Sequence, residues 1–192
     1  WRVNTSGGGR VKGEQAEDRS DVGNTCVALT AFLRSGADLR SGEYSEHMKK
    51  GTEYLMKHIE ANSEDDTLFV SHIRDTQLQS KIGRYVDTFL AAQILSEMKG
   101  SMDTPEAEER RSTLLDKVVA KIGKNQKDDG AFAGNAGWAS VLSQGLCSRS
   151  LNAARLAGAK VSDEMLERDN GQNLTGLDAK TGKFGTVAGA PS

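Results

Sequence analysis

The 192-residue chain is almost neutral, with a formal net charge of −2, and its acidic and basic residues are interspersed along the whole length. This distribution excludes the basic footprint of a nucleic-acid-binding protein and a polybasic membrane anchor, and no run of about 18 apolar residues is present that could span a membrane. With only two prolines and no alternation of apolar and polar residues, the chain is predicted to be all-α.

The first two predicted helices differ in how their apolar residues are distributed. Residues 22–35 are apolar on nearly all sides, so this helix must be buried on most of its surface. Residues 45–61 instead form an amphipathic helix, with an apolar stripe through Met48, Leu55 and Ile59. A fully buried helix followed by a half-buried one predicts a hairpin with an inner and an outer member.

The same alternation follows twice more along the chain. The stretches 84–99 and 139–157 are apolar on most sides, and each precedes an amphipathic stretch, 105–124 and the shorter 162–172. The sequence therefore predicts six main helices in three antiparallel hairpins, whose inner helices form one layer and whose outer helices cover it.

Residues with capping preferences mark the ends of these helices. Ser45, Thr104 and Ser162 can accept hydrogen bonds from the first backbone N–H groups of the outer helices. A glycine in a left-handed turn often ends a helix, and one follows each inner helix: Gly36, Gly100 and Gly158.

An internal repeat supports the three hairpins. A shift of 63 residues aligns "EYLMKHIEANSEDDTLF" (53–69) with "DKVVAKIGKNQKDDGAF" (116–132), so that Asn62 meets Asn125 and Phe69 meets Phe132. The acidic stretch "NQKDDGAF" (125–132) is therefore the second copy of a joint between repeats.

The chain is divided into two parts by composition. Residues 1–20 are Gly-rich and charged, and we expect a flexible segment there, followed by a single repeat domain over 21–192. Because Trp1 and not Met opens the chain, we expect the native start to lie upstream. Three hairpins form at most an open arc, whose apolar surface could be covered by neighbouring repeats of a longer chain, by the Gly-rich N-terminal segment folding back, or by a second copy. We expect the exposed end near the first hairpin and self-association there, most simply as a homodimer. The short polar helix 162–172 would cap the other end.

The second joint also carries a family resemblance. Gln126, Gly130 and Phe132 form a Q-x3-G-x-F sequence that resembles the Q-x3-G-x-W repeat signature of squalene and hopene cyclases. "DVGNTCVALTAFLRSG" (21–36) is similar to their inner-helix pattern and to that of the prenyltransferase β-subunits. The resemblance covers roughly residues 20–185. It implies an α/α toroid with a central cavity, whose sites gather at the ends of the inner helices.

The catalytic motifs of these families do not transfer to this chain. The nearest match to the cyclases' D-x-D-D-T acid motif is "SEDDT" (63–67), which has Ser63 in place of the first Asp and lies in a joint, where a solvated turn is expected. The zinc set of the prenyltransferases is not matched either, because no Cys and His have ligand spacing. The catalytic residues stay unknown, and no metal or cofactor is predicted. Cys26 and Cys147 are interpreted as two buried thiols, although a disulfide stays open.

The candidate binding residues lie near the starts of the inner helices. The joint after Phe69, "VSHIRDTQLQSKIGRY" (70–85), is long and rich in polar side chains, including Arg74. In a toroid, residues at these starts would surround one mouth of the cavity and form a binding rim. They are Asp21, Asn24, His72, Asp75, Arg84, Tyr85, Asp87, Asn135 and Trp138. The alternative is structural: Asp21 and Asp87 would cap helices, while Tyr85 and Trp138 would pack between hairpins.

These observations favour a toroid-like repeat module that lacks the catalytic motifs and binds an apolar or extended ligand, or a protein partner. The alternatives are a terpene-cyclase-like enzyme and a carbohydrate-active toroid enzyme, each with catalytic residues partly outside this chain. The sequence does not define the cellular compartment.

Overall fold

The computed structural model describes residues 20–63, 65–135, 140–175, 177–178, 180 and 183–184. The expected flexible segment, apart from Ser20, lies outside these residues, and so does the candidate rim residue Trp138.

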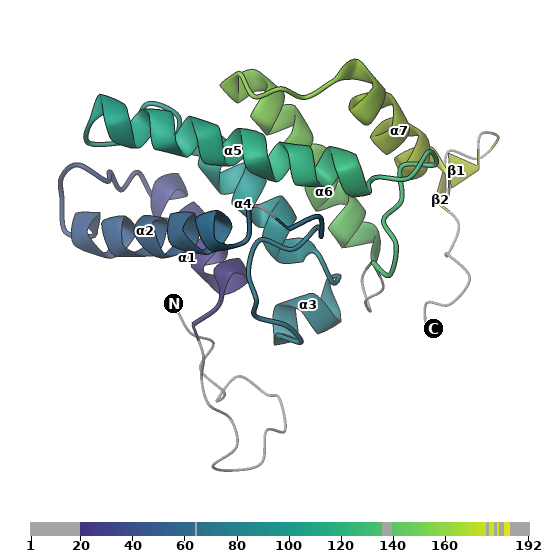
Figure 1. Ribbon diagram of the computed structural model, residues 1–192. Helices are drawn as coiled ribbons and strands as arrows, with labels where there is room; N and C mark the ends of the chain where they lie inside the picture. The colour runs from purple at the N-terminus through teal and green to yellow at the C-terminus, as the bar shows by residue number, and fades with distance from the viewer. Residues whose placement is uncertain are drawn as a thin grey trace, which may run out of the picture.

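The described residues form the six predicted main helices, and the fold is all-α (Figure 1). The three hairpins pair α1 (Val22–Arg34) with α2 (Ser45–Ala61), α4 (Val86–Glu97) with α5 (Pro105–Asn125), and α6 (Ser140–Ala157) with α7 (Asp163–Leu174). The sequence did not predict the short helix α3 (Gln77–Lys81) or the antiparallel pair of two-residue strands, β1 (Leu177–Asp178) and β2 (Lys183–Phe184).

The inner layer consists of α1, α4 and α6, with α4 in the middle, and α2 and α5 pack together outside it. Arg34 at the end of α1 forms an ion pair of 3.4 Å with Glu97 at the end of α4. At the other end, a Cβ added to Gly23 of α1 would lie 2.4 Å from Oδ1 of Asp87 in α4. Both ends of α1 therefore meet the corresponding ends of α4, so the two helices are parallel. Arg34 and Glu97 are separated by the 63-residue repeat shift, which places the repeats in register.

Equivalent joint residues make equivalent hydrogen bonds in the first two repeats. The side-chain amide of Asn62 donates to the carbonyl of His58 at 2.8 Å, and that of Asn125 donates to the carbonyl of Lys121 at 2.9 Å. Each asparagine thus binds the last turn of its own outer helix. The alignment of Asn62 with Asn125 therefore corresponds to a shared local structure.

Most of the predicted helix ends are confirmed. Thr104 and Ser162 accept hydrogen bonds of 3.2 Å from the backbone N–H groups of Ala107 and Met165. The three glycines have left-handed φ angles of 84°, 76° and 95°, for Gly36, Gly100 and Gly158 respectively. The cap predicted at Ser45 is wrong, because α2 begins at Ser45 itself and Tyr44 takes the cap position without a side-chain hydrogen bond.

The core lies between the two layers and follows the predicted stripes. Residues of both layers are fully or almost fully buried, including Leu29 in α1, Leu55 in α2, Phe89 in α4, Ile122 in α5 and Leu151 in α6. The two cysteines are buried free thiols, as the sequence indicated. The inner helices thus have the buried character that their all-round apolar pattern predicts.

Burial of the inner helices is less complete than expected at three positions. Leu90 of α4 is only half-buried, and Leu142 and Leu156 of α6 are 60% and 86% exposed. For the two leucines of α6 the reason is positional: among the described elements α6 packs mainly on α4 and α7, which leaves its remaining face open. The predicted cap at this end, α7, does pack on α6, but it does not cover these two leucines. Exposed apolar side chains such as Val27 also occur in the first hairpin, and self-association stays a prediction.

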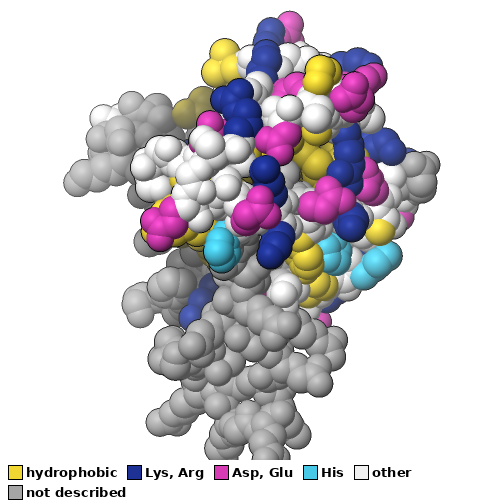
Figure 2. Space-filling model, turned by 90° about the vertical axis from the view of Figure 1, so that its left-hand side faces the viewer, with side chains coloured by type: hydrophobic (Ala, Val, Ile, Leu, Met, Phe, Trp, Pro, Cys, Tyr) yellow, Lys and Arg dark blue, Asp and Glu magenta, His cyan; other side chains and the backbone are white. Residues whose placement is uncertain are grey.

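The surface in Figure 2 carries intermixed charges. Lysine and arginine side chains alternate there with aspartate and glutamate, so no large region of one sign appears on this face. Within the part of the chain that the structure describes, no helix has both the length and the apolar character needed to cross a bilayer.

Truncation of the inner-layer leucines should show that this layer is the core. We expect Leu29→Ala and Leu151→Ala each to lower the free energy of unfolding by about 2–5 kcal/mol in urea denaturation, because each leaves a cavity at a fully buried position. Leu156→Ala is the matched control on an exposed position and should change it by about 0.5 kcal/mol or less. Near-native stability of both core variants would mean that the layers are wrongly assigned.

Candidate ligand-binding site

The parallel inner helices place the predicted rim residues at one end of the molecule. At the start of α1, the carboxylate of Asp21 accepts a hydrogen bond of 2.7 Å from the backbone N–H of Asn24. Asp21 is therefore the helix cap that the structural alternative proposed. Asn24 is half-buried beside it and donates its side-chain amide to the same carboxylate.

Asp87 at the start of α4 has a different environment, and its interpretation as a cap is wrong. Its side chain is directed towards α1 and α3 and is only 3% exposed. Oδ2 accepts a hydrogen bond of 2.8 Å from Nε2 of Gln79, whereas Oδ1 has no hydrogen-bond partner among the described residues. Gly23 is needed opposite this carboxyl, because a Cβ there would overlap with Oδ1.

Burial controls the protonation of this region. The pKa of Asp87 is raised to about 7, mainly by burial and in part by the neighbouring Asp21, against the opposing effects of Gln79 and Arg74. Burial also raises the pKa of Tyr54 to about 12, with both carboxyls contributing. The pKa of Cys26 is raised for the same reasons. The carboxyl of Asp87 can therefore gain or lose its proton near neutral pH.

Gln79 connects the buried carboxyl to the loop that precedes α3. Besides its bond to Asp87, Nε2 donates to the carbonyl of Ile73 at 3.2 Å, while Oε1 accepts from the backbone N–H of Thr76 at 3.3 Å. The hydroxyl of Thr76 accepts in turn from the N–H of Gln79, which completes a capping box. The loop holds Asp75 in a left-handed backbone conformation with φ of 60°.

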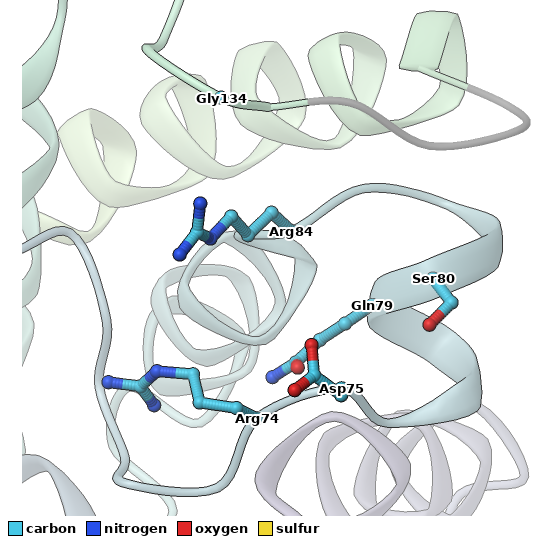
Figure 3. A pocket seen from close by; sticks show the side chains of 6 residues that line it. All are labelled: Arg74, Asp75, Gln79, Ser80, Arg84 and Gly134. Atoms are coloured by element: carbon cyan, nitrogen blue, oxygen red, sulfur yellow. The ribbon is translucent and has the colours of Figure 1, made fainter.

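A pocket of about 410 Å³ opens beside this loop, and Figure 3 shows its lining. It is lined by Arg74, Asp75, Gln79, Ser80, Arg84 and Gly134. Two of the predicted rim residues, Asp75 and Arg84, are among them. Arg74 was noted in the polar joint but was not among the predicted rim residues, and Gln79, Ser80 and Gly134 were not predicted. The T-x-x-Q sequence of residues 76–79 was a recognisable capping signal for Gln79.

The two arginines give the pocket its charge. The guanidinium of Arg74 lies 3.5 Å from the centre of the Phe69 ring, and that of Arg84 lies 5.3 Å from it. Arg74 donates to the backbone carbonyls of Ser71 and Ile73, the latter at 3.0 Å. Burial lowers the pKa of Arg74, and the positive charge of Arg84 contributes to this shift. Neither guanidinium forms an ion pair with another described residue.

Three further rim residues, Tyr85, Asn135 and His72, do not line the pocket. The hydroxyl of Tyr85 donates to the carbonyl of Ala133 at 2.8 Å, and the amide of Asn135 donates to Oγ of Ser143 at 3.2 Å. Tyr85 thus connects the start of α4 to the joint before α6, and Asn135 connects that joint to α6 itself. His72 is exposed and is not part of the lining.

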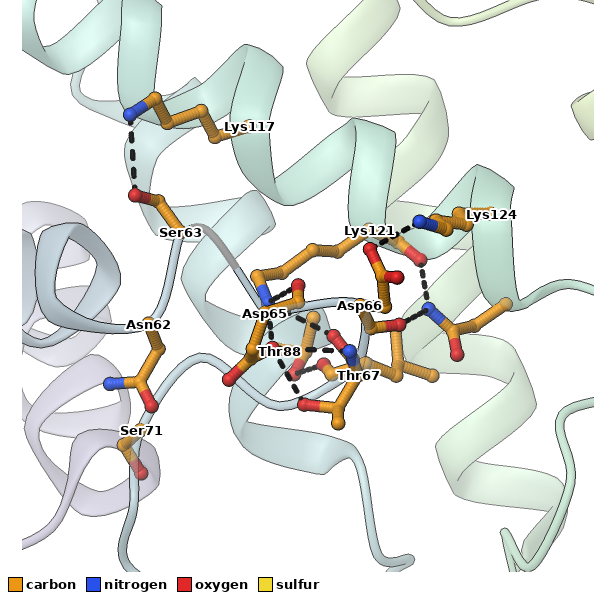
Figure 4. Close-up of polar contacts among 12 residues, drawn as sticks. Asn62, Ser63, Asp65, Asp66, Thr67, Ser71, Thr88, Lys117, Lys121 and Lys124 are labelled. Carbon is orange, nitrogen blue, oxygen red and sulfur yellow. Dashed lines mark hydrogen bonds and ion pairs between the residues drawn. The ribbon is translucent and has the colours of Figure 1, made fainter.

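The acidic joints are structural, which agrees with the interpretation of "NQKDDGAF". In the first joint, Lys121 is only 5% exposed, contacts the carboxylate of Asp65 and donates to the carbonyl of Thr67 at 3.0 Å (Figure 4). In the second, Gln126 donates to the carbonyl of Met165 at 3.2 Å and accepts from Arg168 at the same distance. Each joint is therefore bound by the outer helix of the next hairpin. The aspartates of "SEDDT" (63–67) form ion pairs with α5, so this turn is not simply exposed to solvent as the sequence predicted.

A second buried carboxyl, that of Asp169, lies away from the pocket in the third hairpin. It accepts hydrogen bonds from Gln144 at 2.9 Å, from Asn173 at 3.2 Å and from the hydroxyl of Ser148. Burial raises its pKa. Because Gln144 and Ser148 belong to α6, Asp169 fastens α7 to the inner layer.

The fold and the pocket define this protein as a helical-repeat protein with a polar, arginine-containing cavity at the start of its central helix. No protein-family model, curated protein or solved structure matches the chain. In the part of the chain that the structure describes, no three side chains of His, Cys, Asp or Glu are grouped so that they could hold a metal ion.

The raised pKa of Asp87 predicts a specific dependence of stability on pH. The unfolded carboxyl ionises near pH 3.9, whereas the folded one keeps its proton up to about pH 7. Between these values the folded state binds the additional proton, so the contribution of Asp87 to the free energy of unfolding should fall as the pH rises and level off above about pH 7. We expect Asp87→Asn, which cannot ionise, to give a flatter profile in urea denaturation at pH 4, 5, 6, 7 and 8.

The control is Asp128→Asn, which removes the same charge from an exposed position and should keep the wild-type profile. Asp169 contributes its own slope to all three proteins, so the comparison isolates Asp87. Identical profiles for the wild type and Asp87→Asn would contradict the assignment.

Proposed function

We propose that this chain is a helical-repeat binding module that holds a small anionic ligand in the pocket at the start of α4. One observation carries this proposal: Arg74 and Arg84 both line a cavity of about 410 Å³, and neither has an ion-pair partner among the described residues. The starts of the inner helices are where the resemblance to the cyclase and prenyltransferase repeats implies a site. Membership of that toroid class is part of the proposal.

The electrostatics of the arginine pair favour an anion between them. The charge of Arg84 lowers the pKa of Arg74, which means that the two guanidinium groups repel each other. A carboxylate or phosphate bound by both would replace this repulsion with charge-assisted hydrogen bonds, each worth about 1.5–3 kcal/mol. The planar guanidinium group suits such oxyanions, because it can donate two parallel hydrogen bonds.

The lining also favours a polar ligand over the apolar one that the sequence suggested. All the side chains that line the pocket are polar or charged, and the glycine among the lining residues exposes backbone. The aromatic ring of Phe69 lies under the guanidinium of Arg74 and orients it. An apolar ligand would remove these polar groups from water without providing hydrogen bonds in return.

Binding of simple oxyanions tests the proposal. Isothermal titration calorimetry at constant ionic strength should detect binding of inorganic phosphate, acetate or glutarate to the wild-type chain. Arg84→Ala should weaken that binding by about tenfold or more, because a charge-assisted hydrogen bond is lost. Arg84→Lys should give an intermediate loss, because it keeps the charge and loses the planar donor pair.

Arg149→Ala is the matched control, since it removes an exposed arginine of α6 that does not line the pocket. It should bind as the wild type does. Equal affinities of the wild type and Arg84→Ala for every ligand that binds would overturn the proposal, and so would a failure to bind any of the three anions or any carboxylate that also carries an ammonium group.

A further inference from the structure

The lining of the pocket contains charges of both signs. Asp75 lies with Arg74 and Arg84 around the same cavity, yet no ion pair joins its carboxylate to either guanidinium. The negative charge of Asp75 does reach Arg74 and raises its pKa against the lowering by burial and by Arg84. The cavity therefore separates opposite charges that are close enough to influence each other.

The two kinds of charge face the cavity from different sides. In Figure 3 the guanidinium groups of Arg74 and Arg84 extend to one side, while the carboxylate of Asp75 lies towards α3, near Gln79. The hydroxyl of Ser80 is also on the α3 side. A ligand in the cavity would thus meet hydrogen-bond donors on one side and a carboxylate acceptor on the other.

The position of Asp75 is fixed by its backbone. Gln79 binds the carbonyl of Ile73 and the N–H of Thr76, so it braces the chain on both sides of Asp75. Between them, Asp75 has a φ of 60°, which is uncommon for residues other than glycine and is tolerated best by asparagine and aspartate. Because the loop is braced, the backbone at Asp75 cannot move away from the cavity without breaking these hydrogen bonds.

This arrangement distinguishes between classes of anion. A ligand that carries only negative charge is attracted by the arginines and repelled by Asp75. A ligand that also carries an ammonium group can bind the arginines through its anionic end and Asp75 through its cationic end. A cavity of about 410 Å³ lies in the lower part of the range of small-molecule sites, which suits a ligand of this size class.

We infer that the ligand of the pocket is a small zwitterion, with a carboxylate bound by Arg74 and Arg84 and an ammonium group bound by Asp75. This inference rests on the proposed function and adds the class of ligand. It makes Asp75 the residue that determines specificity, while the arginines supply affinity for the carboxylate.

Matched ligand pairs test the inference. Each pair differs only in an amino group: L-alanine and propanoate, 4-aminobutyrate and butanoate, 6-aminohexanoate and hexanoate. Since the structure does not define the separation of the charges in the ligand, the three pairs vary it. We expect at least one zwitterion to bind the wild-type chain about fivefold to tenfold more tightly than its matched carboxylate, as measured by calorimetry at pH 7.5.

Variants assign the effect to individual residues. Asp75→Asn keeps a side chain that tolerates the left-handed backbone, so it removes the charge and preserves the loop. It should abolish the preference for the zwitterion and bind the matched carboxylate at least as tightly as the wild type does. Arg84→Ala should weaken both members of the pair, and Arg149→Ala should weaken neither. Circular dichroism and thermal unfolding check that each variant is folded.

The inference and the proposed function can fail separately. If the carboxylates or inorganic phosphate bind through Arg84 but no zwitterion binds more tightly than its partner, the inference is overturned and the proposed function stands. The inference is also overturned if the preference for the zwitterion survives in Asp75→Asn. If no tested anion or zwitterion binds, both fail.

Discussion

Burial of α4 is the constraint on which the rest of the structure depends. α1, α5 and α6 all pack against this helix, and side chains such as Phe89 and Leu95 have no exposed surface. A helix enclosed in this way cannot slide along its axis without losing contacts with three neighbours at once. Its first turn therefore has a fixed position, and so do the residues that lead into it. Core packing therefore determines the distance between Arg84 and the joint that carries Gly134, and with it the geometry of the pocket.

The buried carboxyl of Asp87 links this core to the wall of the pocket. A carboxyl placed among apolar side chains is costly when ionised, and one of its oxygens has no hydrogen-bond partner among the described residues. Its single hydrogen bond goes to Gln79, which also holds the loop around Asp75. The protonation of a group inside the core is thus connected, through one amide, to the geometry of a surface loop.

The periodicity of apolar residues was sufficient to predict the six main helices, since inner and outer helices bury different fractions of their surfaces. The polar joint also predicted Asp75 and Arg84 as pocket residues. Other features depend on tertiary contacts that a single sequence does not contain. Asp87 was predicted as a rim residue, with a helix cap as the alternative, because its place near a helix start suits both roles. Only the packing of α1 and α3 shows which way it points. The apolar pattern of residues 139–157 predicted that Leu156 is buried. That pattern does not reveal that one side of α6 has no neighbour. Gln79 was missed although its capping box was visible.

The pocket crosses a boundary between repeats. Arg84 and Ser80 precede the second inner helix, whereas Gly134 belongs to the joint that leads into the third hairpin. In repeat proteins each unit is held by its neighbours, and the free energy of each interface determines how cooperatively the array unfolds. A ligand that binds only the docked arrangement stabilises that interface by an amount that grows with the logarithm of its concentration. If the proposed ligand binds there, its concentration would determine whether the second and third repeats open separately or as one unit.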